Sequence, residues 1–167
     1  LSIIMIQLKL YTAIANELQE SEPEKFELLE EEINIIIHKL KFIHIENRPM
    51  VEIVDLSKPT TDPTYIEELS EIAGAQNNPL VKEPENTEIL IFINDNPAFL
   101  GTLPDLLNEQ YSDYKAVKNN NVFIIQKPDF GKRKGDFLLD TEIFAEIIQS
   151  KYFVYGHEGN HWIKFDL

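Results

Sequence analysis

The sequence predicts an α/β fold: a three-layer lobe with a small, mainly parallel sheet between helices, preceded by a long amphipathic helix. Short apolar runs recur at residues 50–56, 88–93 and 121–126, and each has the length and the β-branched or aromatic content of a buried strand. A stretch with apolar residues three or four positions apart follows each run. Strands that alternate with helices in this way form parallel sheets joined by right-handed crossovers.

The long helix is predicted from an apolar stripe that repeats at alternating spacings of three and four residues. Its members are Phe26, Leu29, Ile33, Ile36, Leu40 and Ile43. This spacing keeps one face apolar over about five turns, at about 3.6 residues per turn. Ser21 and Glu24 have the spacing of a capping box and predict the start of the helix, whereas Asn47-Arg48-Pro49 predicts its end.

The later helices are predicted from their boundaries as well as from their periodicity. Asp62-Pro63 favours a helix start and Gly74 a C-cap. A further helix is expected to begin near Pro97 or Thr102 and to reach Tyr111, and the last helix to span residues 137–149.

The N-terminal stretch LSIIMIQLKLYTAIANEL is apolar, but Gln7 and Lys9 interrupt it before it is long enough to span a bilayer. It also lacks the basic start and the small-residue cleavage site of a signal peptide, so we expect it to be part of the fold. Because the sequence begins with leucine rather than methionine, an upstream part is expected. We divide the chain into residues 1–47, with the N-terminal segment and the connector helix, and residues 48–167, the α/β lobe.

Composition narrows the possible functions. Fifteen Lys and Arg residues against 29 Asp and Glu residues give a formal net charge of −14, which repels nucleic-acid phosphates and anionic membrane surfaces. We therefore expect no nucleic-acid partner. The lack of cysteine excludes disulfides, thiolate metal sites and a cysteine nucleophile. No cofactor is predicted.

Three loops are candidates for ligand binding, because ligands of open α/β sheets gather at the carboxyl ends of the strands. They span residues 55–62, 94–96 and 127–135. The last loop, KPDFGKRKG, is basic in an acidic chain, and its basic residues and Phe130 could hold an anionic or macrocyclic ligand. The alternative is a solvated loop that balances the acidic surface. The predicted ligand-binding residues are Ser57, Lys58, Asn94, Asp95, Asp129, Phe130, Lys132 and Arg133.

Catalytic patterns are few. Residues 157–161, HEGNH, fit the H-E-x-x-H pattern of zinc peptidases, whose two histidines must share one face of a helix. Gly156, Gly159 and the aromatic neighbours instead predict a glycine turn between two short strands, with no metal. Asp55 and Asp95 each follow a strand and could form a carboxylate pair. We predict no catalytic residue, and a small metal-dependent hydrolase is the third choice of function.

Three stretches resemble the C-terminal lobe of helical-backbone substrate-binding proteins, which feed siderophores, haem or cobalamin to ABC importers. They are RPMVEIVDL…YIEELSEIAGAQN (48–77), YKAVKNNNVFIIQ (114–126) and DTEIFAEIIQSKYF (140–153). The resemblance implies that the helix at residues 24–45 connects two lobes. It also implies a small-molecule chelate or corrinoid as ligand, an ABC permease as partner, an extracytoplasmic or periplasmic location and no enzymatic activity.

The resemblance also implies particular ligand contacts. In the cobalamin-binding branch, an acid-aromatic-x-acid-Arg run lines the ligand pocket after the strand that corresponds to residues 121–126. Asp129, Phe130 and Arg133 match this run, and Lys132 stands where the branch has an acid.

A scaffold that self-associates is the alternative function. The apolar stripe of the long helix and the N-terminal residues Ile3, Ile4, Ile6, Leu8 and Leu10 form a large apolar area, and monomers rarely expose such an area. We therefore expect a homodimer paired through residues 1–45, with two-fold symmetry. If residues 1–20 instead fold back over the stripe, the chain is a monomer.

Overall fold

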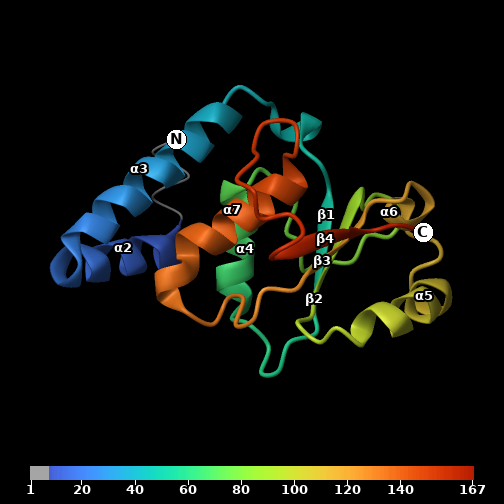
Figure 1. Ribbon diagram of the computed structural model, residues 1–167. Coiled ribbons are helices and arrows are strands. Elements are labelled where there is room, and N and C mark those ends of the chain that lie inside the picture. The colour runs from blue at the N-terminus through green and yellow to red at the C-terminus, as the bar shows by residue number, and fades with distance from the viewer. Residues whose placement is uncertain (1–7) are drawn as a thin grey trace.

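A computed structural model of the chain describes residues 8–167 and shows a four-stranded sheet between two layers of helices (Figure 1). The strands are β1 (Val51–Asp55), β2 (Ile89–Ile93), β3 (Val122–Ile125) and β4 (Trp162–Phe165), in that order across the sheet. The first three are parallel, and β4 is antiparallel to β3. The predicted α/β class with a small, mainly parallel sheet is confirmed.

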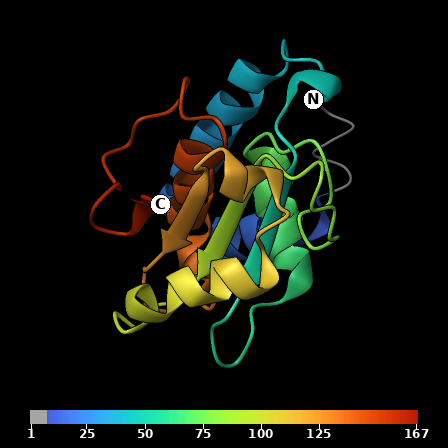
Figure 2. The same cartoon turned by 90° about the vertical axis from the view of Figure 1, so that its right-hand side faces the viewer.

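The helices are divided between the two faces of the sheet (Figures 1 and 2). One face is covered by α2 (Lys9–Ser21), α3 (Pro23–Leu40), α4 (Pro63–Ile72) and α7 (Phe137–Ile148). The other face is covered by α5 (Phe99–Gln110) and the short α6 (Lys115–Lys118). Two short 3₁₀ helices, η1 (Ile45–Asn47) and η2 (Lys134–Asp136), lie in the connections.

Side chains of the strands alternate between two apolar cores, as period-two structure requires. In β2, Ile91 and Ile93 face the core with α4 and α7, whereas Leu90 and Phe92 face the core with α5. All four are at most 2% exposed. The prediction that this strand is covered on both faces is therefore confirmed.

Helices α4 and α5 lie on opposite faces, although the strands they connect step in the same direction across the sheet. Two right-handed crossovers taken in one direction would place both helices on the same face. The expectation of right-handed crossovers throughout is therefore wrong.

The outer edge of β1 is covered by the chain that follows α4. The side-chain oxygen of Asn77 accepts a hydrogen bond from Val51 N (2.8 Å), and its amide nitrogen donates to Val51 O (3.0 Å). Further along, Pro79 O accepts from Ile53 N (2.9 Å). These bonds satisfy backbone groups that an edge strand would otherwise offer to another chain.

The start of the long helix differs from the prediction. Ser21 ends α2, and its hydroxyl donates to Glu17 O (2.8 Å) rather than capping the next helix. The chain turns at Glu22, and α3 begins at Pro23 without a side-chain cap and ends at Leu40. The predicted capping box is therefore wrong, because the residue assigned to it is already helical.

Helix α2 folds back along α3 (Figure 1). The carboxylate of Glu68 on α4 accepts hydrogen bonds from Leu10 N (2.9 Å) and Tyr11 N (2.8 Å), which binds the N-terminus of α2 to α4. Negative charge is favourable at this end of a helix.

The predicted apolar stripe of α3 is covered within the chain. Leu29, Ile33, Ile36 and Leu40 are all at most 3% exposed and belong to one core. The fold-back alternative thus describes residues 8–21, and the uncovered stripe that suggested a homodimer is not found. The expected contributions of Ile3, Ile4 and Ile6 lie outside the described residues, and the oligomeric state stays a prediction.

The segment before β4 is attached to α7 by the buried carboxylate of Glu146. One carboxylate oxygen accepts from Tyr155 N (2.6 Å) and Gly156 N (3.0 Å), and the other from His157 N (3.1 Å) and Trp162 Nε1 (3.0 Å). Burial alone would raise the pKa of Glu146, but these bonds hold it below its usual value.

No helix within residues 8–167 has both the length and the apolar character needed to cross a membrane.

Candidate functional site

The carboxyl ends of β1, β2 and β3 meet at a small pocket of about 60 Å³. Six of the eight predicted ligand-binding residues line it: Ser57, Lys58, Asp95, Asp129, Phe130 and Lys132. The other two lie beside it. Asn94 supports its own turn by accepting a hydrogen bond from Asn96 N (2.9 Å), and Arg133 is exposed and pairs with Asp129 (2.8 Å).

Asp55 organises the loop that follows β1. One carboxylate oxygen accepts from the backbone N–H and the hydroxyl of Ser57, and the other accepts from Thr61 N (2.6 Å). The carboxylate is therefore used inside its own loop, whereas Asp95 lines the pocket. The two acids therefore have different surroundings.

Lys132 connects the loops that follow β1 and β3. Its ammonium group donates to the hydroxyls of Ser57 (3.0 Å) and Thr61 (2.8 Å), and the Thr61 hydroxyl donates to Phe130 O (3.2 Å). These partners are neutral. Within residues 8–167, neither Lys132 nor Lys58 forms an ion pair with a carboxylate. Two lysines that form no ion pair within these residues therefore line the pocket, together with the carboxylates of Asp95 and Asp129.

A buried network behind the pocket holds the loop that follows β3. Lys127 is 6% exposed, and its ammonium lies 3.0 Å from an oxygen of Asp136 and 3.1 Å from an oxygen of Asp140. The second oxygen of Asp140 accepts from Tyr65 OH (2.8 Å) and Gly131 N (3.0 Å). Burial raises the pKa of Asp140 to about 6, against the opposing charge of Lys127.

Phe130 is not the exposed aromatic that the sequence suggested. Its side chain is 2% exposed, and its ring centroid lies 5.3 Å from that of Phe144 in the core. Asp129 has a positive φ of 58°, and the turn there directs the next side chain inward. Ring contact between Phe130 and a ligand outside the pocket is therefore excluded in this conformation.

The loops that follow β1 and β3 approach each other closely at Gly131. This residue has a φ of 75°, and a Cβ added to it would lie 2.3 Å from the methyl carbon of Thr61. Only glycine fits both the backbone conformation and the space. Together with the contacts of Lys132 and Asp140, this close approach fixes the loop to the fold, unlike a loop that is merely solvated.

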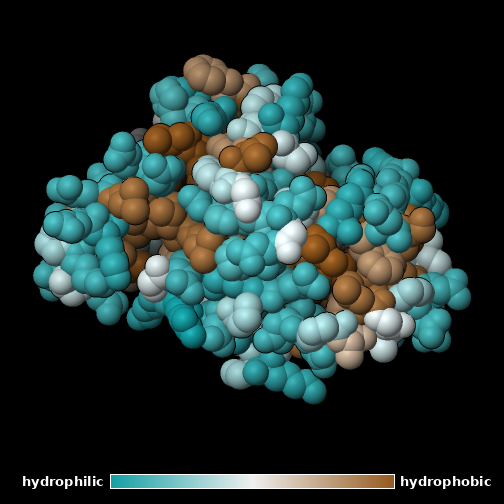
Figure 3. Space-filling model, viewed as in Figure 1, coloured by the Kyte–Doolittle hydropathy of each residue, from teal (hydrophilic) through white to brown (hydrophobic). Residues whose placement is uncertain are grey.

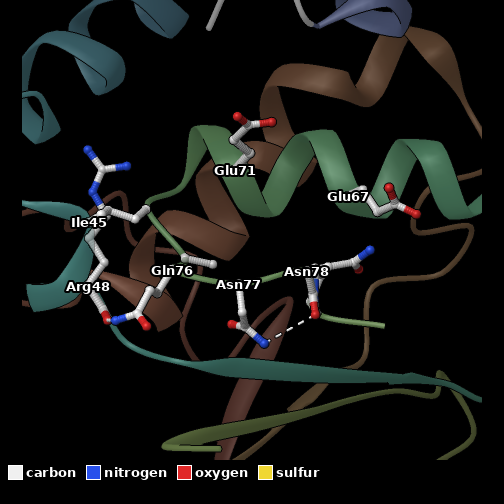
Figure 4. Close-up of a pocket in the computed structure, with 9 residues that line it drawn as sticks. Ile45, Arg48, Glu67, Glu71, Gln76, Asn77 and Asn78 are labelled. Carbon is white, nitrogen blue, oxygen red and sulfur yellow. Dashed lines mark hydrogen bonds between the residues drawn. The ribbon is translucent and has the colours of Figure 1, made fainter. Parts of the chain in front are cut away.

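A second pocket, of about 410 Å³, lies between η1, α4 and the chain that covers β1 (Figure 4). Several of its polar groups already have structural partners. Arg48 donates to the carbonyls of Ile43 (3.2 Å) and Leu40 (2.9 Å) at the end of α3, and Asn77 binds the edge of β1 and donates to Asn78 O, as the dashed line in Figure 4 shows. These contacts assign Arg48 and Asn77 to the fold, whereas the smaller pocket gathers six of the predicted residues and is the better candidate.

The HEGNH segment forms the predicted glycine turn. Gly156 and Gly159 have positive φ values of 88° and 85°, and the turn leads into β4, but the predicted strand at residues 152–155 is not formed. His157 Nε2 lies 2.9 Å from Glu142, and burial, together with the nearby His157 and Lys127, lowers the pKa of His161. The helix that the zinc pattern requires is absent here, and no three His, Asp or Glu side chains of residues 8–167 are grouped as a metal site.

The residues that sequence reasoning missed are those that act through tertiary contacts. Thr61 and Tyr65 are distant in sequence from the basic loop, whereas Asp140 follows it on α7, and no local pattern distinguishes the three. The basic loop itself could be identified because its charge contrasts with the acidic chain.

No protein-family model, curated protein or solved structure matches this chain.

Proposed function

We propose that this chain binds the anionic group of a small molecule at the carboxyl ends of β1, β2 and β3, and does not transform it. The supporting observation is the Lys132 ammonium, which contacts two neutral hydroxyls and forms no ion pair with a carboxylate of residues 8–167. Lys58 lines the same pocket. A fixed cation with only neutral partners favours an anion through charge-assisted hydrogen bonds.

The size of the pocket limits what can enter it. A volume of about 60 Å³ admits a carboxylate or a similar small group, so the body of a larger ligand would lie outside, against the loops. The ligand classes that the resemblance implies have both a small anionic group and a larger body. Haem, many siderophores and cobalamin each carry a carboxylate, a catecholate or a phosphate on a larger body.

The proposed physiological role follows from the resemblance to substrate-binding proteins of ABC importers. In that role the chain is the ligand-binding lobe for an iron-siderophore, haem or cobalamin-type ligand. It acts on the extracytoplasmic side, and an ABC permease is its partner.

The test compares two lysine variants that change the net charge equally. Lys132→Gln removes the cation of the pocket, and Lys118→Gln removes an exposed cation next to the opposite end of β3. Haemin, a ferric siderophore and cyanocobalamin are titrated by calorimetry and by the fluorescence of Trp162, the only tryptophan. We expect the tightest ligand to bind about tenfold more weakly to Lys132→Gln, as for the loss of one charge-assisted contact, and unchanged to Lys118→Gln.

The same titrations can contradict the proposal. If the two variants bind the ligand equally tightly, the pocket is not part of the binding site. If none of the three ligands binds, the scaffold alternative is favoured. Binding should weaken as salt concentration rises, because screening reduces the attraction. Mass spectrometry of the recovered ligand should show it unchanged, and a modified ligand would refute binding without chemistry.

A further inference from the structure

The outer side of α3 has a straight apolar line that the fold leaves exposed. Leu28, Ile35 and Phe42 follow at intervals of seven residues, with exposed fractions of 52%, 40% and 77%. Two helical turns contain about seven residues, so these side chains lie one above another. Phe42 is just beyond the end of α3, but its ring centroid lies 6.4 Å from that of His38, which keeps it on the line.

The surface of the molecule shows the same feature. In Figure 3 apolar patches lie along α3, and further apolar patches lie on the right of the same view. This outer line is distinct from the buried stripe of α3, whose residues face the core. Exposed apolar side chains in one line are typical of a helix that packs against a second helix.

The charges along α3 decide what kind of helix fits. Residues 24–32 contain five glutamates, and residues 38–44 contain two lysines, two histidines and no acid. A second copy in the parallel direction would set acid against acid, in a chain that already has a net charge of −14. An antiparallel second copy would set the acidic half of each α3 against the basic half of the other.

We infer that two copies of this chain associate through the outer sides of α3, antiparallel, with a two-fold axis at Ile35. Residues at about equal distances before and after Ile35 then lie at about the same height along the paired helices. Leu28 of one copy meets Phe42 of the second copy, and Ile35 meets its own equivalent. In this direction the smaller side chain at one end of the apolar line meets the larger one from the other end.

Charge pairs flank the apolar contacts in this arrangement. At about 100° per residue, Glu32 and Lys39 lie on one side of the line and Glu31 and His38 on the other. The two-fold operation brings Glu32 of one copy next to Lys39 of the second, and Glu31 next to His38. Each pair occurs twice, once for each copy. Lys39 and Glu31 are exposed in the single chain, although the Lys39 ammonium lies 5.4 Å from the ring centroid of Phe153 and must leave it to reach the second copy.

Sedimentation equilibrium of the full chain across micromolar concentrations tests the association. We expect a reversible dimer with twice the chain mass of 19.4 kDa. Ile35→Asp should raise the dissociation constant at least about 100-fold, because two charges would meet at the axis. Val81→Asp is the control, since Val81 is 50% exposed but lies in the loop between α4 and β2. A full chain that stays monomeric, or a dimer that Ile35→Asp leaves intact, overturns the inference.

Cross-linking through single introduced cysteines tests the direction of pairing, because the chain has no cysteine of its own. Leu28→Cys and Phe42→Cys are prepared separately and treated with a short thiol-to-thiol cross-linker, alone and mixed. Antiparallel pairing predicts rapid cross-linking in the mixture and little with either variant alone. Cross-linking of Leu28→Cys to itself would show the parallel direction and overturn the arrangement.

Charge reversal tests the flanks. Glu32→Lys should weaken the dimer about tenfold, and Glu32→Lys combined with Lys39→Glu should restore it, because the pair forms again between copies. If the double variant does not regain dimer affinity, Glu32 and Lys39 are not in contact across the interface. The chain without residues 1–7 should associate as the full chain does. If only the shortened chain associates, residues 1–7 cover the line and the inference fails.

Discussion

Glu146→Gln should detach the segment before β4 from α7. The native carboxylate accepts four hydrogen bonds, two on each oxygen, from three backbone N–H groups and Trp162 Nε1. The glutamine oxygen can accept two of them, and its amide group turns further N–H donors toward the other two. Two donors without partners at about 1.5 kcal/mol each give an expected loss of about 3 kcal/mol of unfolding free energy.

Urea denaturation measures this loss, with Trp162 fluorescence as the local signal and far-ultraviolet circular dichroism as the global one. Glu142→Gln is the matched control, one turn earlier on α7, where the carboxylate contacts only the ring of His157 (2.9 Å). We expect the control to lose about 1 kcal/mol or less, as for a partly exposed ion pair. A loss in Glu146→Gln no larger than in the control would refute the reasoning.

The pH dependence gives a second check on Glu146. Its pKa in the folded protein is below the usual value of 4.5, so its contribution to stability is present above that pH and is lost as pH falls through the folded pKa. The stability difference between the native chain and Glu146→Gln should therefore shrink in acid. A difference that stays constant down to the unfolding of both chains would contradict the assigned role.

Three further predictions concern the loops and the sheet edge. The pKa of Asp140 is raised from 3.8 to about 6, so the folded chain binds more protons than the unfolded chain between these pH values. The free energy of unfolding should therefore fall as pH rises through this window. Asp140→Asn should remove that fall. Gly131→Ala should lower the urea midpoint by the equivalent of about 2 kcal/mol, whereas Gly135→Ala, with no atom within 4 Å of the added Cβ, should be neutral. Asn77→Ala should speed hydrogen exchange of the Val51 amide and promote aggregation through the uncovered edge of β1, whereas Asn78→Ala should not.

The sequence alone was sufficient to predict the helices and strands that have local sequence signals. The strands β2 and β3 are continuous apolar runs, β1 is rich in β-branched residues, and α4 has a start at Asp62-Pro63 and a stop at Gly74, which the structure confirms. In the N-terminal segment, Tyr11, Ile14, Ala15 and Leu18 have helical spacing and are buried or partly buried. That pattern could have predicted α2, but the apolar residues before it obscured the period.

The candidate site was predictable only in outline. Parallel strands bring the loops at their carboxyl ends together, so residues that follow the strands could be predicted as ligand-binding residues. Six of the eight predicted residues line one pocket. The burial of Phe130 depends on a positive φ at Asp129, and the role of Lys132 depends on a hydroxyl about seventy positions away. Neither is encoded by local spacing, because each requires the loops to be placed relative to one another.

The sheet separates two apolar cores that contact different parts of the molecule. The core with α5 and α6 contains neither the basic loop nor any residue of α3. Substitutions there should change stability additively with changes on the other face, since distant sites without shared partners rarely couple. The proposed binding and the proposed self-association both lie on the other half, so the core with α5 and α6 can vary in sequence without contacting either surface.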